Sequence, residues 1–234
     1  MQSISTFGVV GAGQMGRGIA QIAAMNGYAV KLADASLELA KAGRERLGRD
    51  LARLAQARKL TGSEADQILG RIRAEEKLTA LADCEFVIEA VSENLPLKQQ
   101  VFRELDAVVA PEAILASNTS SISLTKLAAV SRRPERVIGL HFMNPVPVMK
   151  LVEIVRALQT GDETYESTCD LARRLGKAIV TTKDMPAFIV NRLLIPQLNE
   201  ACFALTEGLG TLEDIDTAVR LGLNHPMGPF ELAD

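Results

Sequence analysis

The sequence has no tryptophan, two tyrosines and two histidines among its 234 residues. Proteins that bind single-stranded nucleic acid stack the bases on aromatic side chains, and their binding surfaces are usually basic. This chain carries a net charge of -3 at pH 7, so nucleic acid is not expected as a partner. Because histidine is the side chain that titrates near neutral pH, His141 and His225 are the candidates for an imidazole base.

Long apolar runs and a cleavable leader are also missing. Residues 1–4 lead directly into an apolar strand-like segment, and no apolar run approaches the roughly 20 residues of a membrane span. We therefore expect no membrane association and a cytoplasmic location. Cys84, Cys169 and Cys202 are odd in number and lack metal-ligand spacing, which predicts reduced thiols with neither a disulfide nor a metal site.

Apolar segments alternate with stretches of helical spacing along most of the chain. The predicted strands are 6–10, 28–33, 85–91, 113–116, 137–140, 150–156 and 178–182. This alternation predicts a doubly wound, mainly parallel α/β sheet. From Phe188 the pattern is wholly helical, with a near capping box at Thr211 and Asp214. We expect one domain at 1–185 and a helical domain at 186–234.

A glycine-rich turn connects the first predicted strand to a helix. It reads Gly11-Ala12-Gly13-Gln14-Met15-Gly16, and Asp34 ends the next predicted strand. Gly11 permits the tight turn, Gly13 lets the backbone approach a pyrophosphate, and Gly16 lets the helix pack on the strand. A carboxylate at Asp34 would bond the ribose hydroxyls of NAD and repel the extra phosphate of NADP. The pattern predicts NAD binding; the alternative is an exposed strand-end aspartate beside a structural turn.

A long charged stretch, residues 36–73, separates the second and third predicted strands. It is interrupted at 60–63, which predicts two helices in a hairpin. Arg46, Arg49 and Arg53 share one face of the first helix. This basic face would hold the phosphates of a large anionic substrate. The alternative is a helix that is arginine-rich for solubility alone.

His141 stands at the end of the apolar segment 137–140, and Glu153 follows it. Open α/β sheets place their chemistry where strands end and loops begin, whereas His225 lies in a turn rich in glycine and proline. His141 is therefore the candidate general base. The alternative is a hydrogen-bonded structural histidine.

Several segments together resemble the L-3-hydroxyacyl-CoA dehydrogenases over essentially the whole chain. They are 117–121, 139–153, 188–192, 214–216 and 225–229. The resemblance implies reversible oxidation of a 3-hydroxyacyl-CoA to the 3-ketoacyl-CoA, with NAD as hydride acceptor. It also implies a Rossmann domain, a helical domain that usually dimerises, and a place in fatty-acid metabolism such as β-oxidation.

By position, the resemblance assigns four catalytic residues. It makes His141 the base and Glu153 the carboxylate that orients it, while Ser120 contacts the reacting oxygen and Asn191 holds the substrate. Each has a structural alternative: Ser120 as a helix cap, Asn191 as a cap or a helix–helix contact, and Glu153 as a surface charge at a strand end. The resemblance also places Glu93, Lys98 and Asn118 near the nicotinamide half of the cofactor, and it lays the CoA moiety along the basic hairpin.

Two departures from the family pattern concern the helical domain. Ala187 stands where the family commonly has glycine, which would slightly stiffen the connection between the domains. The chain stops at 231–234 within a segment that the family continues, so we expect an incomplete helical domain. Two other functions stay open: a relative acting on a free sugar acid, such as gulonate dehydrogenase, and a non-catalytic NAD-binding protein resembling a lens crystallin.

Overall fold

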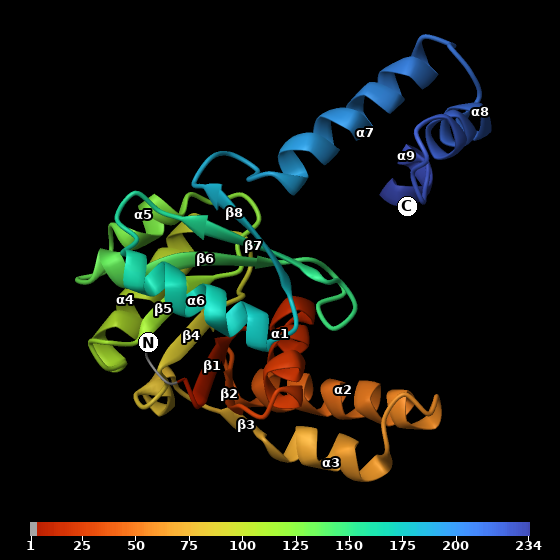
Figure 1. The fold of residues 1–234 in the computed structure, drawn as a ribbon. Helices are drawn as coiled ribbons and strands as arrows, with labels where there is room; N and C mark the ends of the chain where they lie inside the picture. Colours follow the sequence, from red (N-terminus) through yellow and green to blue (C-terminus); the bar gives the residue numbers. More distant parts are fainter. Residues whose placement is uncertain (1–3) are drawn as a thin grey trace. The chain divides into compact units, whose positions relative to one another are not determined.

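The computed structural model describes residues 4–234, which form two compact units that divide between Pro186 and Ala187 (Figure 1). The first unit is built on one sheet, and the second is helical. The predicted α/β class with a helical C-terminal part is confirmed.

The sheet has eight strands in the order β3-β2-β1-β4-β5-β6-β7-β8. The strands are β1 (Thr6–Val10), β2 (Ala29–Ala33), β3 (Ile72–Glu75), β4 (Phe86–Glu89), β5 (Ile114–Ser117), β6 (Val137–Phe142), β7 (Leu151–Arg156) and β8 (Ala178–Lys183). β1 to β6 are parallel to one another, whereas β7 is antiparallel to β6 and parallel to β8. The carboxyl ends of six strands therefore meet at one edge, where an open sheet places its ligand.

Helices cover both faces of this sheet. They are α1 (Gln14–Met25), α2 (Leu37–Gln56), α3 (Gly62–Gly70), α4 (Leu95–Val108), α5 (Leu124–Ala128) and α6 (Asp162–Arg174), with 3₁₀ turns η1 (Leu78–Leu81) and η2 (Pro134–Arg136). Phe86 and Ile88 of β4 share an apolar core with Ile19 of α1 and Leu171 of α6. Val87 points to the opposite face because strand side chains alternate. On that face α4 packs on β5 and α5 packs on β6.

Two features of the sheet differ from the sequence prediction. The predicted helical hairpin ran to Arg73, but the chain leaves α3 earlier and forms β3, a four-residue edge strand beside β2. The direction of β7 was also not predicted. The eight residues 143–150 that join β6 to β7 are too few for a parallel crossover, which needs about a dozen.

A buried carboxylate anchors the far end of α4. Asp106 accepts hydrogen bonds from the Arg132 and Arg133 guanidiniums and from the Ser131 hydroxyl, at 2.8, 2.9 and 2.7 Å. Burial alone would raise the pKa of the Asp106 carboxyl, but these hydrogen bonds together outweigh it and lower that pKa to about 2. The cluster stabilises the folded state whenever Asp106 is ionised.

Replacing Asp106 with asparagine is expected to lower the free energy of unfolding at pH 7 by on the order of 2 kcal/mol. The folded pKa lies below the unfolded value near 3.8, so this contribution is complete above about pH 5 and is lost as the pH falls towards 2. Urea unfolding of both proteins between pH 7 and pH 3 measures it. As a control, Asp170→Asn removes a more exposed pair with Arg173 and should cost less than about 1 kcal/mol. A difference between wild type and Asp106→Asn that does not shrink with falling pH contradicts the prediction.

The second unit contains α7 (Val190–Thr206), α8 (Leu212–Thr217), the π-helical turn η3 (Ala218–Gly222) and α9 (Pro229–Ala233). The capping box predicted at Thr211 and Asp214 is present at the start of α8. Asp216 is buried, and its carboxylate accepts hydrogen bonds from the backbone amides of Phe230 and Glu231. This contact joins the sequence motif at 214–216 to the segment that follows 225–229.

The chain enters the second unit through two residues in the left-handed region of backbone space. Ala187 has a φ of 66° and Phe188 a φ of 53°. An L-residue with a Cβ atom loses roughly 1–2 kcal/mol in this region. Alanine at 187 is therefore strained where glycine would not be, and its effect on the connection between the domains stays a prediction.

Among residues 4–234, no helix combines the length and the apolar character that a membrane crossing requires. Cys84 and Cys169 are buried free thiols and Cys202 is an exposed one. Burial raises the pKa of the Cys84 thiol to about 12, so this side chain packs as a small apolar group. The described residues contain no group of three potential ligands that could hold a metal ion.

Candidate active site

A cavity of about 1050 Å³ opens where β1, β2 and β4 end. Its lining comes from the glycine turn, the residues after β2, the segment around η1 and one face of α4. The lining includes Gly11, Gly13, Gln14, Met15, Asp34, Glu76, Thr79, Ala90, Val91, Leu97, Gln100 and Glu104. Five residues that the sequence predicted for cofactor binding thus share one cavity, and Gly16 lies next to it in α1.

Each glycine of the turn has a different surrounding. Gly11 has a φ of 105°, and a Cβ atom there would lie 2.5 Å from the Ala90 carbonyl oxygen. A Cβ on Gly16 would lie 1.8 Å from the Gly11 carbonyl oxygen, whereas a Cβ on Gly13 would have nothing within 4 Å. Gly11 and Gly16 are thus required by the backbone itself, while Gly13 leaves open space on the cavity side.

Asp34 joins the glycine turn to the end of β2. Its Oδ2 accepts a hydrogen bond from the Ala12 amide at 2.6 Å, and its Oδ1 accepts one from the Ala35 amide at 2.6 Å. Each carboxylate oxygen has a second lone pair, and Asp34 lines the cavity. The carboxylate therefore orders the turn and still offers acceptors to ligand hydroxyls.

The cavity fits a dinucleotide. The amino end of α1 at Gln14 directs backbone N–H groups and the positive end of the helix dipole towards the space beside Gly13. An acceptor for ribose hydroxyls, Asp34, stands at the second strand, and the apolar side chains Val101 and Leu97 of α4 form a wall. These residues would hold the pyrophosphate at the turn and one ribose at Asp34.

His141 and Glu153 face each other across the antiparallel pair β6 and β7. They are register partners, and Nδ1 of His141 lies 2.8 Å from Oε2 of Glu153. His141 is buried with 7% of its surface exposed, and Glu153 is fully buried. The predicted alternative for Glu153, a surface charge, is therefore wrong. The imidazole is held at the carboxyl end of β6 by a carboxylate with no access to water.

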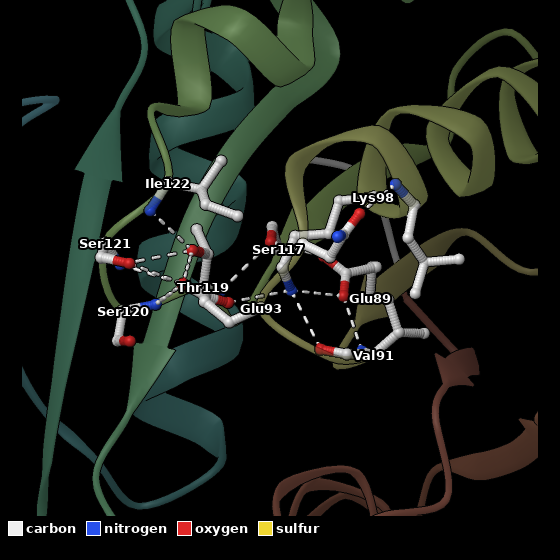
Figure 2. A network of polar contacts seen from close by, with 11 residues as sticks. Glu89, Val91, Glu93, Lys98, Ser117, Thr119, Ser120, Ser121 and Ile122 are labelled. Atoms are coloured by element: carbon white, nitrogen blue, oxygen red, sulfur yellow. Dashed lines mark hydrogen bonds and ion pairs between the residues drawn. The ribbon is translucent and has the colours of Figure 1, made fainter.

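Ser120 lies in a turn after β5 that the carboxylate of Glu93 organises (Figure 2). Oε1 of Glu93 accepts hydrogen bonds from the Ser120 amide at 3.0 Å, from the Ser121 amide and hydroxyl at 3.1 Å each, and from the Thr119 hydroxyl. Burial alone would raise the pKa of Glu93, but hydrogen bonds from Thr119 and Ser121 and the charge of Lys98 lower it. The Ser120 side chain does not cap a helix here, because Ser123 caps α5.

Lys98 and Asn118 lie beside this turn rather than on the cavity wall. The Lys98 ammonium is almost fully buried and contacts Glu89 at 2.7 Å and Glu93 at 3.3 Å. Oδ1 of Asn118 accepts a hydrogen bond from the Phe142 amide at 3.0 Å, so the segment that carries Ser120 is joined to the residue after His141. The cofactor roles of Glu93, Lys98 and Asn118 stay predictions.

The loop after His141 is attached to the dinucleotide side of the unit. The Gln14 amide donates to Oδ1 of Asn144 at 3.0 Å. The Lys177 ammonium donates to the Val146 and Met149 carbonyl oxygens at 2.6 and 2.7 Å. Sequence reasoning missed Lys177, because a lone lysine after a helix carries no signal of this contact. The structure thus connects the cofactor turn with the loop that follows the candidate base.

The basic face of α2 is exposed as predicted: Arg46, Arg49 and Arg53 are all on the surface. Arg53 makes one exposed ion pair with Asp50 at 3.3 Å. Arg44, on the same helix, instead donates to backbone carbonyl oxygens at the end of α3 and in β3. The face offers exposed positive charge to a ligand, but these exposed side chains do not by themselves define a specific binding site.

Asn191 and His225 belong to the second unit. Asn191 lies in the first turn of α7, and His225 is exposed in the loop before α9. The structure brings together Ser120, Asn118, His141 and Glu153 at the carboxyl edge of the sheet, and the position of Asn191 relative to them stays a prediction.

Two family models match the chain. One, described as 3-hydroxyacyl-CoA dehydrogenase, NAD binding domain, matches residues 6–185. The other, described as 3-hydroxyacyl-CoA dehydrogenase, C-terminal domain, matches residues 188–234.

Individual relatives agree with these matches. The chain is 51% identical to 3-hydroxybutyryl-CoA dehydrogenase of Bradyrhizobium diazoefficiens over 99% of its own length and 79% of the relative. It is 43% identical to the human mitochondrial hydroxyacyl-coenzyme A dehydrogenase, covering 97% of this chain and 74% of that one. The crystal structure of (S)-3-hydroxybutyryl-CoA dehydrogenase from Ralstonia eutropha superposes with a TM-score of 0.96 at 47% identity, covering 99% and 82% of the two chains.

Proposed function

The chain belongs to the 3-hydroxyacyl-CoA dehydrogenase family and is an NAD-dependent oxidoreductase, and we propose that His141 is the base of its reaction. The pairing of His141 with the buried Glu153, at the same sheet edge as a dinucleotide cavity, carries this proposal. The reaction oxidises a 3-hydroxyacyl-CoA to the 3-ketoacyl-CoA and is reversible.

The residues of the chain account for the proton in this reaction. NAD, when bound, accepts the hydride that leaves carbon 3 of the substrate. An ionised Glu153 only accepts hydrogen bonds, so it fixes the hydrogen on Nδ1 of His141 and leaves the lone pair on Nε2. Nε2 takes the hydroxyl proton, and the Glu153 carboxylate stabilises the imidazolium that forms. In the reverse direction His141 returns the proton.

Two further side chains act on the substrate in this proposal. The Ser120 hydroxyl donates to the reacting oxygen, at which negative charge develops as the proton is lost. Asn191 holds the substrate; this assignment rests on the Phe188–Arg192 motif alone. The burial of Glu153 and the ordered Ser120 turn support a prearranged site in this proposal.

The test is the loss of NADH absorbance when the protein is mixed with acetoacetyl-CoA. We expect turnover that depends on both compounds. Bound NADH without turnover of acetoacetyl-CoA, together with reduction of NAD by a free sugar acid such as gulonate, would contradict the proposed substrate class. Bound NADH with no turnover of either would favour the non-catalytic alternative.

We propose a short-chain substrate, 3-hydroxybutyryl-CoA, because the relatives named above carry that name. The phosphates of CoA would lie on the basic face of α2. Reversing the charge of Arg46, Arg49 and Arg53 to glutamate is expected to raise KM for acetoacetyl-CoA by about tenfold or more at low salt and to leave kcat nearly unchanged.

A control variant shows whether the effect is specific to the basic face of α2. The same change at the exposed Arg173 and Arg174 of α6 is the matched control and should leave KM unchanged. A KM that stays constant in the α2 variant would favour the solubility explanation of this face.

A homodimer and a cytoplasmic location are also proposed. Large apolar side chains of α7 support the dimer, since Leu193, Ile195 and Phe203 are more than half exposed. Sedimentation equilibrium tests the oligomeric state, and cell fractionation tests the location.

A further inference from the structure

A ring of hydrogen bonds surrounds the carboxylate of Glu89 at the end of β4 (Figure 2). Glu89 has no exposed surface, and Lys98 beside it is 1% exposed. Burying charged groups is costly unless they are paired and hydrogen-bonded. The proposed reaction uses neither side chain directly, so their burial at this edge of the sheet has another role.

Both oxygens of the Glu89 carboxylate are occupied. Oε1 accepts hydrogen bonds from the Val91 amide at 2.6 Å and from the Lys98 ammonium at 2.7 Å. Oε2 accepts one from the Ser117 hydroxyl at 2.6 Å. Val91 lines the dinucleotide cavity, and Ser117 is the last residue of β5. Glu89 therefore joins the cavity wall to the end of the neighbouring strand.

The first connection from Glu89 to the Ser120 turn passes through Ser117. The Ser117 hydroxyl donates to Glu89, and its oxygen accepts a hydrogen bond from the Thr119 amide at 3.2 Å. Thr119 is buried and directly precedes Ser120. The backbone that enters the turn is thus held by a hydroxyl whose direction Glu89 fixes.

The second connection passes through Lys98 and Glu93. The Lys98 ammonium donates to Glu89 and to the Val91 carbonyl oxygen at 3.1 Å, and it lies 3.3 Å from Oε2 of Glu93. The other oxygen of Glu93 accepts the hydrogen bonds of the Ser120 turn. Lys98 therefore places the carboxylate to which the turn is attached, and Glu89 places Lys98.

We propose that Glu89 is a positioning residue that fixes the Ser120 turn relative to the wall of the NAD cavity, through Ser117 on one side and Lys98 on the other. The inference rests on the proposed role of Ser120. Two separate connections start at the Glu89 carboxylate and end on adjacent residues of the same short turn. A buried ion pair that only stabilised the fold would not need both connections to reach this turn. The role of Lys98 follows from the same contacts: it acts through Glu93 and not by touching the cavity.

The competing explanation is that the ring only stabilises the fold. Asp106 provides a matched comparison, because it is a carboxylate of α4, the helix that carries Lys98, and it is also buried and paired with cationic side chains. Its partners are Ser131, Arg132 and Arg133, and within residues 4–234 no hydrogen bond or ion pair of Asp106 leads to the Ser120 turn. Asp106→Asn should therefore lower thermal stability without lowering kcat.

The experiment compares Glu89→Gln with Asp106→Asn in the full chain. Three quantities are measured: steady-state kinetics with acetoacetyl-CoA, NADH affinity by fluorescence titration, and hydrogen exchange of peptides that cover residues 117–124 without ligand. For Glu89→Gln we expect kcat to fall about tenfold to a hundredfold, because a displacement of about 1 Å at a reacting group has effects of this size. The amides of the turn should exchange faster, and NADH affinity should change less than kcat.

Ser117→Ala covers the case of a Glu89→Gln protein that does not fold, and a double variant tests whether Glu89 and Lys98 act along one connection. Ser117→Ala removes one connection and keeps the ion pair, so a several-fold fall in kcat with NADH affinity retained is expected. In the double variant Glu89→Gln and Lys98→Met, kcat should match that of Glu89→Gln within about twofold, because the two residues act along one connection. Additive losses would overturn this arrangement.

The outcomes separate this inference from the proposed function. If kcat and the exchange of residues 117–124 are both unchanged in Glu89→Gln while thermal stability falls, the positioning role is wrong. If the turn loses protection and kcat falls in Glu89→Gln but not in Asp106→Asn, the role is supported. Ser120→Ala in the same assay tests the proposed function: an unchanged kcat there overturns the role of Ser120, while hydrogen exchange still decides whether Glu89 orders the turn.

Discussion

Replacing His141 with glutamine is expected to lower kcat by about 10²–10⁴, the usual contribution of a positioned general base. Glutamine has a similar reach and can keep a hydrogen bond to Glu153, but it cannot take the substrate proton. Because His141 is not among the residues that line the dinucleotide cavity, the change should leave NADH binding intact. Stopped-flow measurement of NADH oxidation with acetoacetyl-CoA gives the rate of the chemical step directly.

The partner residue supplies the matched comparison. Glu153→Gln should also lower kcat, because an amide can no longer stabilise the imidazolium or fix the hydrogen on Nδ1. The double variant should be no slower than His141→Gln alone, because residues that act as one unit have non-additive effects. Unchanged turnover in His141→Gln would show that another group takes the proton, and the proposed mechanism would then be abandoned.

Alanine at Gly16 is expected to have the largest structural effect of any single methyl group added at the cofactor turn. Its Cβ would lie 1.8 Å from the Gly11 carbonyl oxygen, and that oxygen belongs to the backbone, so the turn must move. Overpacking usually costs about 1–3 kcal/mol and occasionally more, and this contact belongs at the upper end. We expect Tm to fall by about 10 °C and NADH affinity to fall about a hundredfold or more.

Two other glycines separate folding from binding in this experiment. A Cβ at Gly13 meets nothing within 4 Å, yet Gly13 lines the cavity, so Gly13→Ala should fold normally and still weaken NADH binding. A Cβ at Gly70 also meets nothing, and Gly70 is absent from the cavity lining, so Gly70→Ala should change neither property. Equal NADH affinity in wild type and Gly16→Ala would contradict the assignment of this turn to the cofactor.

The parts of the fold that the sequence predicted well are those where local pattern and global packing agree. The segment Thr6–Val10 is apolar and is followed by glycines, and it forms β1, an interior strand of the sheet. The change to helical spacing at Phe188 likewise precedes a helical unit. Strand β3 was missed because Arg73 and Glu75 alternate with two apolar residues over only four positions, a pattern too short to distinguish from the end of a helix.

The residues of the candidate site could be predicted where they belong to a sequence motif. Contacts between side chains from different segments could not be predicted. Gly11 and Asp34 stand out because they belong to the dinucleotide-binding pattern, whereas His141 and Glu153 stand out because they match the family motif at 139–153. The sequence did contain a signal for Glu89, because it is a carboxylate at the end of the otherwise apolar strand Phe86–Glu89. Its partners were not predictable, because one sequence does not state which side chains of β4, α4 and β5 meet.

The antiparallel pairing of β6 with β7, and not the loop that joins the two strands, holds His141 next to Glu153. His141 and Glu153 are register partners, so the ladder of the two strands sets their distance, and residues 143–150 need only close the hairpin. Closing a longer loop costs little free energy, since each doubling of its length adds only about 0.6 kcal/mol. A longer loop is therefore expected to leave the distance between His141 and Glu153 unchanged, whereas a one-residue slip of β7 would turn Glu153 to the other face of the sheet.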